Sequence, residues 1–326
     1  MNHCDNKENI ERRSLKVLYF YLTEGCNMLC RHCWLAPRFD EDGKTYPVID
    51  VELFTDVIRQ AKPLGLYKVK LTGGEPLLHP HIQEILDVVK NENLQISIET
   101  NATLCTPTIA RQIASFKTPF VSVSLDGANA QTHEYIRGVP GCFEKAKRGI
   151  LNLIKAGVSP QIILTIMQHN VDQIEAVIRL AESLGAKSVK YNLVQPASRG
   201  EMLHREGQTV PVAKLIEIGR YVEETLSKTT KLPLYFTYPH AFRPLGRMFD
   251  ENERECASCG ILNVLGVLPG GSFALCGIGE IIPELTFGNA KTDMLKNVWE
   301  KNPVLNLLRK GLPSNLKGIC SNCVMS

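Results

Sequence analysis

Three cysteines stand close together near the N-terminus, at Cys26, Cys30 and Cys33. Their C-x3-C-x2-C spacing is not usual for zinc, and three thiolates do not complete a tetrahedral zinc site. Soft thiolates suit iron–sulfur clusters, and three of them would leave one iron of a four-iron cluster open to another ligand. The spacing therefore predicts a reactive iron–sulfur centre. The alternative is a structural metal site that borrows His32 or a distant cysteine as its fourth ligand.

A second group of cysteines lies in the last third of the chain. Its members are Cys256, Cys259, Cys276, Cys320 and Cys323. Four of these thiolates are enough for one fully ligated [4Fe–4S] cluster. The C-x2-C motifs at 256–259 and 320–323 also form a reasonable Cys4 zinc arrangement, so both metals stay open.

Composition and charge exclude several classes of protein. The 326 residues carry 37 basic and 34 acidic side chains, a formal net charge of +3, which does not call for a nucleic-acid or anionic-membrane partner. No apolar run approaches the roughly 18 residues of a membrane span. Charged residues occupy the N-terminus where a secretory signal needs an apolar stretch. We expect a cytoplasmic protein, and in that reducing compartment clustered cysteines indicate metal binding.

The elements that would position the first cysteines form a regular alternation. Strand patterns are followed by helical patterns, and short polar or glycine-rich sequences follow each strand. The strands are expected at 17–22, 68–71, 95–98, 120–125, 161–166 and 188–193. The helices are expected at 51–61, 82–91, 108–115, 143–156, 171–184 and 212–226. This α/β pattern predicts a partial (β/α)6 TIM-like barrel with one site at the strand C-termini, and an open doubly wound sheet is the alternative.

At this point the chain resembles the radical S-adenosylmethionine (SAM) superfamily. The resemblance covers about residues 17–193 and depends on the three cysteines followed by Gly73-Gly74-Glu75-Pro76. It implies a partial barrel in which a [4Fe–4S] cluster binds SAM and cleaves it reductively to a 5′-deoxyadenosyl radical. It also implies a one-electron donor of the flavodoxin or ferredoxin type.

The same resemblance implies roles for residues outside the cysteines. The glycines would let backbone approach the methionine amino group, Glu75 would lie near that ammonium or cap a helix, and Arg137 would pair with the SAM carboxylate. The expected cofactor-binding residues are His32, Gly73, Gly74, Glu75, Asn101, Ser124, Asp126 and Arg137.

The C-terminal cysteines resemble the SPASM domain, an auxiliary-cluster extension of radical SAM enzymes. The pattern is C-x11-G-x4-C from Cys259 to Cys276, with a later C-x2-C at Cys320 and Cys323. Because no further spaced cysteines follow, we expect the shortened "twitch" form with these four ligands and one auxiliary cluster. Cys256 is surplus, and it could replace Cys259, be inert, or donate a hydrogen atom in catalysis. The expected division is an N-terminal extension (1–16), the barrel (17–230) and the twitch-like domain (231–326).

The resemblance favours a peptide or protein substrate, modified by epimerisation, crosslinking or oxidation after hydrogen abstraction. A small biosynthetic intermediate, such as an aminoglycoside, a tetrapyrrole or a nucleotide precursor of the molybdenum cofactor, is the alternative substrate. A metal-bearing, peptide-binding scaffold without catalysis is the alternative of another class. Sequence alone leaves the reaction that follows hydrogen abstraction open.

Overall fold

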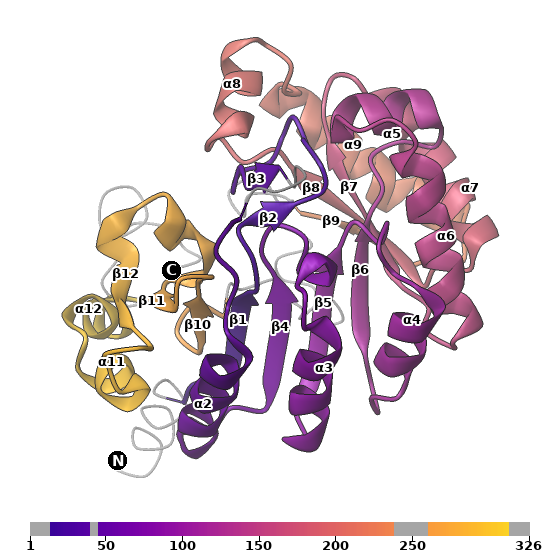
Figure 1. The fold of residues 1–326 in the computed structure, drawn as a ribbon. Coiled ribbons are helices and arrows are strands. Elements are labelled where there is room, and N and C mark those ends of the chain that lie inside the picture. The colour runs from indigo at the N-terminus through magenta and orange to yellow at the C-terminus, as the bar shows by residue number, and fades with distance from the viewer. Residues whose placement is uncertain (1–13, 40–44, 238–259, 313–326) are drawn as a thin grey trace, which may run out of the picture.

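One ten-stranded sheet organises the part of the chain that the computed structural model describes, residues 14–39, 45–237 and 260–312. Its strand order is β12-β11-β10-β1-β4-β5-β6-β7-β8-β9 (Figure 1). Its six central strands are β1 (Val17–Tyr21), β4 (Lys68–Thr72), β5 (Gln95–Thr100), β6 (Phe120–Ser124), β7 (Gln161–Ile166) and β8 (Ser188–Leu193). All six pair in parallel and begin at the predicted residue, so the predicted α/β fold is confirmed.

Shorter strands extend this sheet at both edges. At one edge β9 (Leu234–Phe236) pairs in parallel with β8, and at the other β10 (Val264–Val267) pairs in parallel with β1. The antiparallel strands β11 (Ser272–Ala274) and β12 (Thr286–Asn289) follow β10. A separate two-stranded ladder joins β2 (Gly25–Cys26) to β3 (Arg38–Phe39).

Amphipathic helices cover the convex face of the sheet. They are α2 (Val51–Ala61), α3 (Ile82–Asn91), α4 (Pro107–Ala114), α6 (Cys142–Lys155) and α7 (Ile174–Leu184). The Asp50 side chain caps the first of them by accepting from the backbone N–H groups of Glu52 and Leu53. Alternation along β4 sends Val69 and Leu71 into this fully buried layer. The opposite face of the same strands is therefore left to polar side chains.

The remaining helices lie at the strand C-termini or beyond the sheet edges (Figure 1). They are α5 (Ala130–Arg137), α8 (Arg199–Arg205), α9 (Val212–Glu224), α11 (Leu295–Lys301) and α12 (Pro303–Gly311). The short 3-10 turns are η1 (Lys62–Leu64), η2 (Pro76–Leu78), η3 (Val171–Gln173), η4 (Leu226–Lys228), η7 (Cys276–Glu280) and η8 (Pro283–Leu285). No helix among the described residues is long and apolar enough to cross a membrane.

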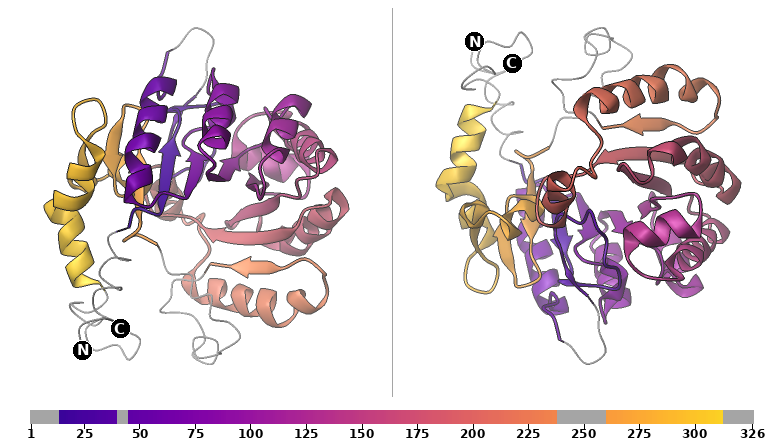
Figure 2. Two further views of the ribbon diagram at one scale, coloured as in Figure 1. Left: turned by 90° about the horizontal axis from the view of Figure 1, so that it is seen from below. Right: turned by 90° about the horizontal axis from the view of Figure 1, so that it is seen from above.

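The sheet is curved, as both views of Figure 2 show. The curvature brings Lys190 of β8 within electrostatic range of Glu99 on β5 and Lys70 on β4. Two strands lie between β8 and β5, and three lie between β8 and β4. An approach across so many strands is expected for a partial barrel and not for a flat sheet.

Strands from both sides of residue 231 belong to this one sheet, since β9 and β10 extend opposite edges. The C-terminal helix α11 also packs against α2, and the Leu295 backbone N–H donates to Gln60 Oε1 at 2.8 Å. The C-terminal part is thus attached to the barrel, and its division into a separate functional domain stays a prediction.

Candidate active site

The loop that follows β1 carries the first three cysteines at the C-terminal edge of the sheet (Figure 1). Cys26 and Cys30 are buried, Cys33 is partly exposed, and all three are free thiols. Met28 and Cys142 pack beside them in a small apolar cluster. The loop is fixed to α5, because Leu29 N–H donates to Arg137 O and Arg31 N–H donates to Ile136 O, both at 2.9 Å.

Burial raises the pKa of both inner thiols above its ordinary value. At Cys30 the Arg137 guanidinium opposes this effect, since its Nη1 donates to Cys30 Sγ at 3.4 Å. Metal binding requires thiolates, so binding here would release protons. Among the described residues no three His, Cys, Asp or Glu side chains converge on a single metal ion.

The turn after β4 approaches the cysteine loop more closely than a side chain would allow. Gly74 N–H donates to Thr23 O at 2.9 Å, and Glu75 N–H donates to Gly25 O at 3.0 Å. A Cβ on Gly74 would lie 1.9 Å from the Gly25 carbonyl oxygen, and Gly73 has a φ of 122°. The two glycines are thus required for packing against the first cysteine's own loop, a reason that the motif alone did not reveal.

Glu75 is buried, and its carboxylate is occupied by contacts within the protein. It accepts from Leu77 N–H, from Thr100 Oγ1 at 2.5 Å and from Asn101 N–H at 2.7 Å. It therefore caps η2 and joins the end of β4 to the end of β5, which fits the helix-capping role of the sequence interpretation. Burial raises the pKa of Glu75 to about 7. Its contact with a SAM ammonium stays a prediction.

A buried ion pair lies behind the cysteines. Arg137 Nη2 is 2.7 Å from Asp126 Oδ2, and His32 Nε2 is 3.8 Å from the same oxygen. Burial alone would raise the pKa of Asp126, but Arg137 and His32 outweigh it and lower that pKa. Burial lowers the pKa of His32 to about 4, so its imidazole is neutral at pH 7. The structure thus brings Asp126, Arg137, His32 and Cys30 into one cluster.

Asn101 and Ser124 lie at neighbouring strand ends in this region. Asn101 Nδ2 donates to Asn27 Oδ1 at 2.8 Å, which connects the end of β5 to the cysteine loop. Ser124 is the last residue of β6 and is partly exposed, and its hydroxyl makes no hydrogen bond with any described residue.

Two residues that the sequence interpretation did not single out also hold the cysteine loop. Asn27, inside C-x3-C, contacts Asn101 and donates to Thr103 Oγ1 at 2.9 Å. Arg199, at the start of α8, donates to Cys30 O at 3.3 Å and to Pro37 O at 3.1 Å. Position inside the motif was an available signal for Asn27, whereas Arg199 is 169 residues from its partner.

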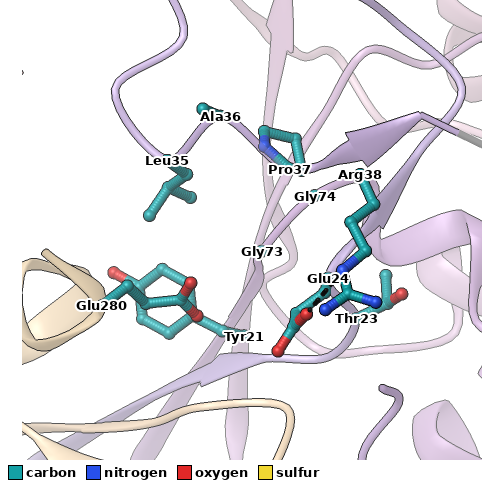
Figure 3. A pocket seen from close by; sticks show the side chains of 10 residues that line it. All are labelled: Tyr21, Thr23, Glu24, Leu35, Ala36, Pro37, Arg38, Gly73, Gly74 and Glu280. Atoms are coloured by element: carbon teal, nitrogen blue, oxygen red, sulfur yellow. Dashed lines mark ion pairs between the residues drawn. The ribbon is translucent and has the colours of Figure 1, made fainter. Parts of the chain in front are cut away.

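A cavity of about 140 Å³ opens beside the two glycines (Figure 3). Its lining residues are Tyr21, Thr23, Glu24, Leu35, Ala36, Pro37, Arg38, Gly73, Gly74 and Glu280. Figure 3 shows the Tyr21 ring beside Glu280 and the ion pair between Arg38 and Glu24, at 3.3 Å. The cavity therefore joins the first cysteine loop to the segment that begins at Cys276.

Cys276 is the one predicted auxiliary ligand within the described residues. It begins η7 with a φ of 50°, and its thiol is partly exposed. Burial, followed by Cys276 and Glu99, raises the pKa of Tyr21 above its ordinary range, so this phenol lies close to Cys276. Cys256, Cys259, Cys320 and Cys323 lie outside the described residues, and their predicted roles stay predictions.

Residues 20–184 match the family described as the Radical SAM superfamily. This chain belongs to that superfamily. It is 31% identical to the AdoMet-dependent heme synthase of Methanosarcina barkeri, across 94% of this chain and 88% of that protein. It is 30% identical to the mycofactocin maturase MftC of Mycolicibacterium smegmatis, across 56% of this chain and 45% of that protein. The expected radical SAM enzyme with maturase relatives is confirmed.

The solved structures include Streptococcus suis SuiB bound to its precursor peptide SuiA. It matches 94% of this chain and 70% of its own at 18% identity, with a TM-score of 0.76. SuiB bound to S-adenosylmethionine matches with a TM-score of 0.74 at 19% identity. At these identities the likeness shows the radical SAM fold alone.

The residues present fit the [4Fe–4S] cluster and SAM that radical SAM proteins bind. Among the described residues, His32 Nδ1, Asp126 Oδ2 and Arg137 Nε are buried without a hydrogen bond, although Asp126 and Arg137 are ion-paired. All three atoms belong to the cluster of side chains behind Cys30. Buried polar atoms without hydrogen bonds are costly, so their gathering here indicates a position where a polar group would satisfy them.

Proposed function

We propose that this chain is a radical SAM enzyme that acts on a tetrapyrrole precursor of heme. The observation that carries the proposal is the extent of sequence similarity. Similarity to the M. barkeri heme synthase covers 94% of this chain, whereas similarity to MftC covers 56%. The heme synthase thus resembles this chain well beyond the 165 residues of the matched radical SAM region (184 − 20 + 1).

In this proposal Cys26, Cys30 and Cys33 hold a [4Fe–4S] cluster with one open iron. Bound together, the cluster and SAM would supply a 5′-deoxyadenosyl radical that abstracts a hydrogen atom from the substrate. A flavodoxin- or ferredoxin-type protein would donate the electron. The roles of the surrounding side chains follow from their contacts.

Arg137 orients the site by binding Asp126 and Cys30 with two of its nitrogens, and its unpaired Nε is suited to a carboxylate. Neutral His32 has one ring nitrogen that donates and one that accepts, which suits an adenine-type partner. Ser124 would offer its hydroxyl to the carboxylate or ribose of SAM. The Asn27–Asn101 hydrogen bond holds the cysteine loop against β5.

The auxiliary site is a second part of the proposal. Cys276 with Cys259, Cys320 and Cys323 would bind one further [4Fe–4S] cluster. Support comes from the place of Cys276, which follows β11 and lies close to Tyr21 in the wall of the cavity beside Gly73. Zinc at this site is the competing outcome.

Peptide maturation is the second candidate function. It is favoured by the similarity to MftC and by the fold shared with SuiB, a protein that binds a precursor peptide. The match covers only 45% of MftC, so more than half of that protein is not compared with this chain.

The test is an anaerobic reaction of the reconstituted protein with SAM and dithionite. Iron porphyrins that carry propionate side chains are supplied as substrates in one set, and SuiA-type precursor peptides in another. The proposal predicts deoxyadenosine and a heme product, detected by absorbance and mass spectrometry. A modified peptide together with an unchanged porphyrin would contradict the tetrapyrrole proposal and support peptide maturation.

A further inference from the structure

Lys190 is a half-buried lysine in the middle of β8, on the concave side of the sheet. Its neighbours Val189 and Tyr191 are fully buried against the helices, and Tyr191 Oη donates to Ile174 O near the start of α7. Because side chains alternate along a strand, Lys190 must point to the opposite, concave face. This placement puts a half-buried ammonium group on the concave face of the sheet.

Lys190 has no ion pair or hydrogen bond with any described residue. Burial lowers the pKa of Lys190. The charge of Glu99 opposes this effect and that of Lys70 adds to it, without a direct contact in either case. A half-buried ammonium without a counter-ion is unfavourable and is normally paired. Within the described residues, the positive charge of Lys190 is therefore available on this face.

Lys70 is bound within the protein, which makes the contrast with Lys190 informative. Its Nζ lies 2.5 Å from Glu99 Oε1 and stands over the ring of Tyr19 at 4.6 Å. Thr72 Oγ1 also donates to Glu99 at 3.3 Å. Glu99 of β5 is thus already bound to Lys70 and Thr72 of β4, and it forms no ion pair with Lys190.

Register places Lys190 in line with the proposed SAM side of the site. Ser124 on β6 pairs with Ile163 on β7, which pairs with Lys190 on β8. Parallel strands are roughly 4.8 Å apart, so the two side chains stand about 10 Å apart on one face. A molecule held beside Ser124 would reach Lys190.

We infer that Lys190 binds a carboxylate of the substrate, with the Lys70–Glu99 pair forming the opposite wall of the same site. The inference rests on the proposed function for the identity of that substrate, a tetrapyrrole, since heme and its precursors carry carboxylate side chains. An ammonium held in a partly desolvated site recognises such a group by a charge-assisted hydrogen bond. Lys190 thereby selects substrates that present an anion to β8.

The test is a fluorescence titration of the reconstituted, SAM-loaded protein with zinc protoporphyrin IX and with its dimethyl ester. The acid has two carboxylates and the ester has none. The inference predicts that Lys190→Met weakens binding of the acid by roughly 10- to 100-fold and leaves binding of the ester unchanged. Lys190→Arg should keep most of the affinity.

Lys187→Met is the matched control, because it removes the same charge from the residue just before β8. Lys187 stands over the Phe120 ring at 3.9 Å, at the N-terminal end of the strands. Binding of the acid should be unchanged in this variant. A variant that loses its fold would fail to bind the ester too, which separates misfolding from loss of the carboxylate contact.

Equal affinities of the parent protein for acid and ester, or an unchanged acid affinity in Lys190→Met, would overturn the inference. Lys190-dependent binding of the acid, with no tetrapyrrole turned over, would keep the carboxylate site and remove the proposed function. Heme formation that does not depend on Lys190 would do the reverse.

Discussion

Arg137 lies 2.7 Å from Asp126 and donates to Cys30 Sγ at 3.4 Å, so one buried guanidinium connects β6, α5 and the cysteine loop. Burial alone would lower the pKa of Arg137, but Asp126 and Cys30 outweigh it and raise that pKa. Both partners of the pair are therefore charged at neutral pH. A charge removed here leaves its partner buried and uncompensated.

Replacing Arg137 by Met should lower the free energy of unfolding by about 3–5 kcal/mol, because Asp126 would stay buried without its partner. The double variant Arg137→Met, Asp126→Asn should recover part of that loss. Urea denaturation of the metal-free protein measures both. Equal losses in the single and double variants would show that the pair is not coupled as the distance indicates.

Gly74→Ala should prevent the turn after β4 from packing on the cysteine loop. The added Cβ would lie 1.9 Å from Gly25 O, which is backbone and cannot move aside alone. We expect reduced iron uptake on reconstitution, measured as iron per chain, and a lower melting temperature. Gly270→Ala is the control, since nothing lies within 4 Å of its added Cβ. Normal iron uptake by Gly74→Ala would contradict the packing argument.

Glu75 should make the protein less stable as the pH rises. Burial raises its pKa from 4.5 to about 7, so the folded state holds a proton that the unfolded state has released in between. The contribution of Glu75 to stability is thus greatest below about pH 4.5 and falls until about pH 7. Glu75→Gln should remove this slope.

The measurement for Glu75 is the difference in free energy of unfolding between parent and Glu75→Gln at several values between pH 4.5 and 8. The glutamine also turns an NH₂ group toward one backbone donor, which adds a loss of about 1–3 kcal/mol that does not vary with pH. A difference that stays constant with pH would show that Glu75 is ionised throughout.

Cys276→Ser should remove the auxiliary cluster and leave the first one. Iron per chain should fall by about four, while SAM cleavage with dithionite continues. Cys142→Ser is the control, because Cys142 is buried beside the first cysteines without belonging to either motif. Loss of zinc with an unchanged iron content would assign the C-terminal site to zinc.

The strands were predictable because apolar residues alternate with polar ones or follow one another in short runs, as at 68–72 (KVKLT) and 161–166 (QIILTI). Helix α5 was not predicted, since its buried residues include the polar Thr132, His133 and Arg137, and the last two contact Asp126. A periodicity search detects apolar faces and misses a helix that is buried through polar contacts.

Within the site, the residue types were readable but their contacts were not. The motif indicated Gly74 and Glu75, yet the packing on Gly25 and the bonds to Thr100 and Asn101 depend on where β5 and the cysteine loop lie. The hydrogen bond from Arg199 to Cys30 O joins segments 169 residues apart, so no local sequence pattern predicts it.

The central claim is that this chain cleaves SAM through the first three cysteines and passes the radical to a carboxylated tetrapyrrole. The most direct measurement uses SAM, dithionite and a propionate-bearing iron porphyrin with the parent protein and Cys30→Ala. The proposed function predicts deoxyadenosine and heme from the parent protein and neither product from Cys30→Ala. Deoxyadenosine from both proteins, or from the parent with the porphyrin unchanged, would contradict it.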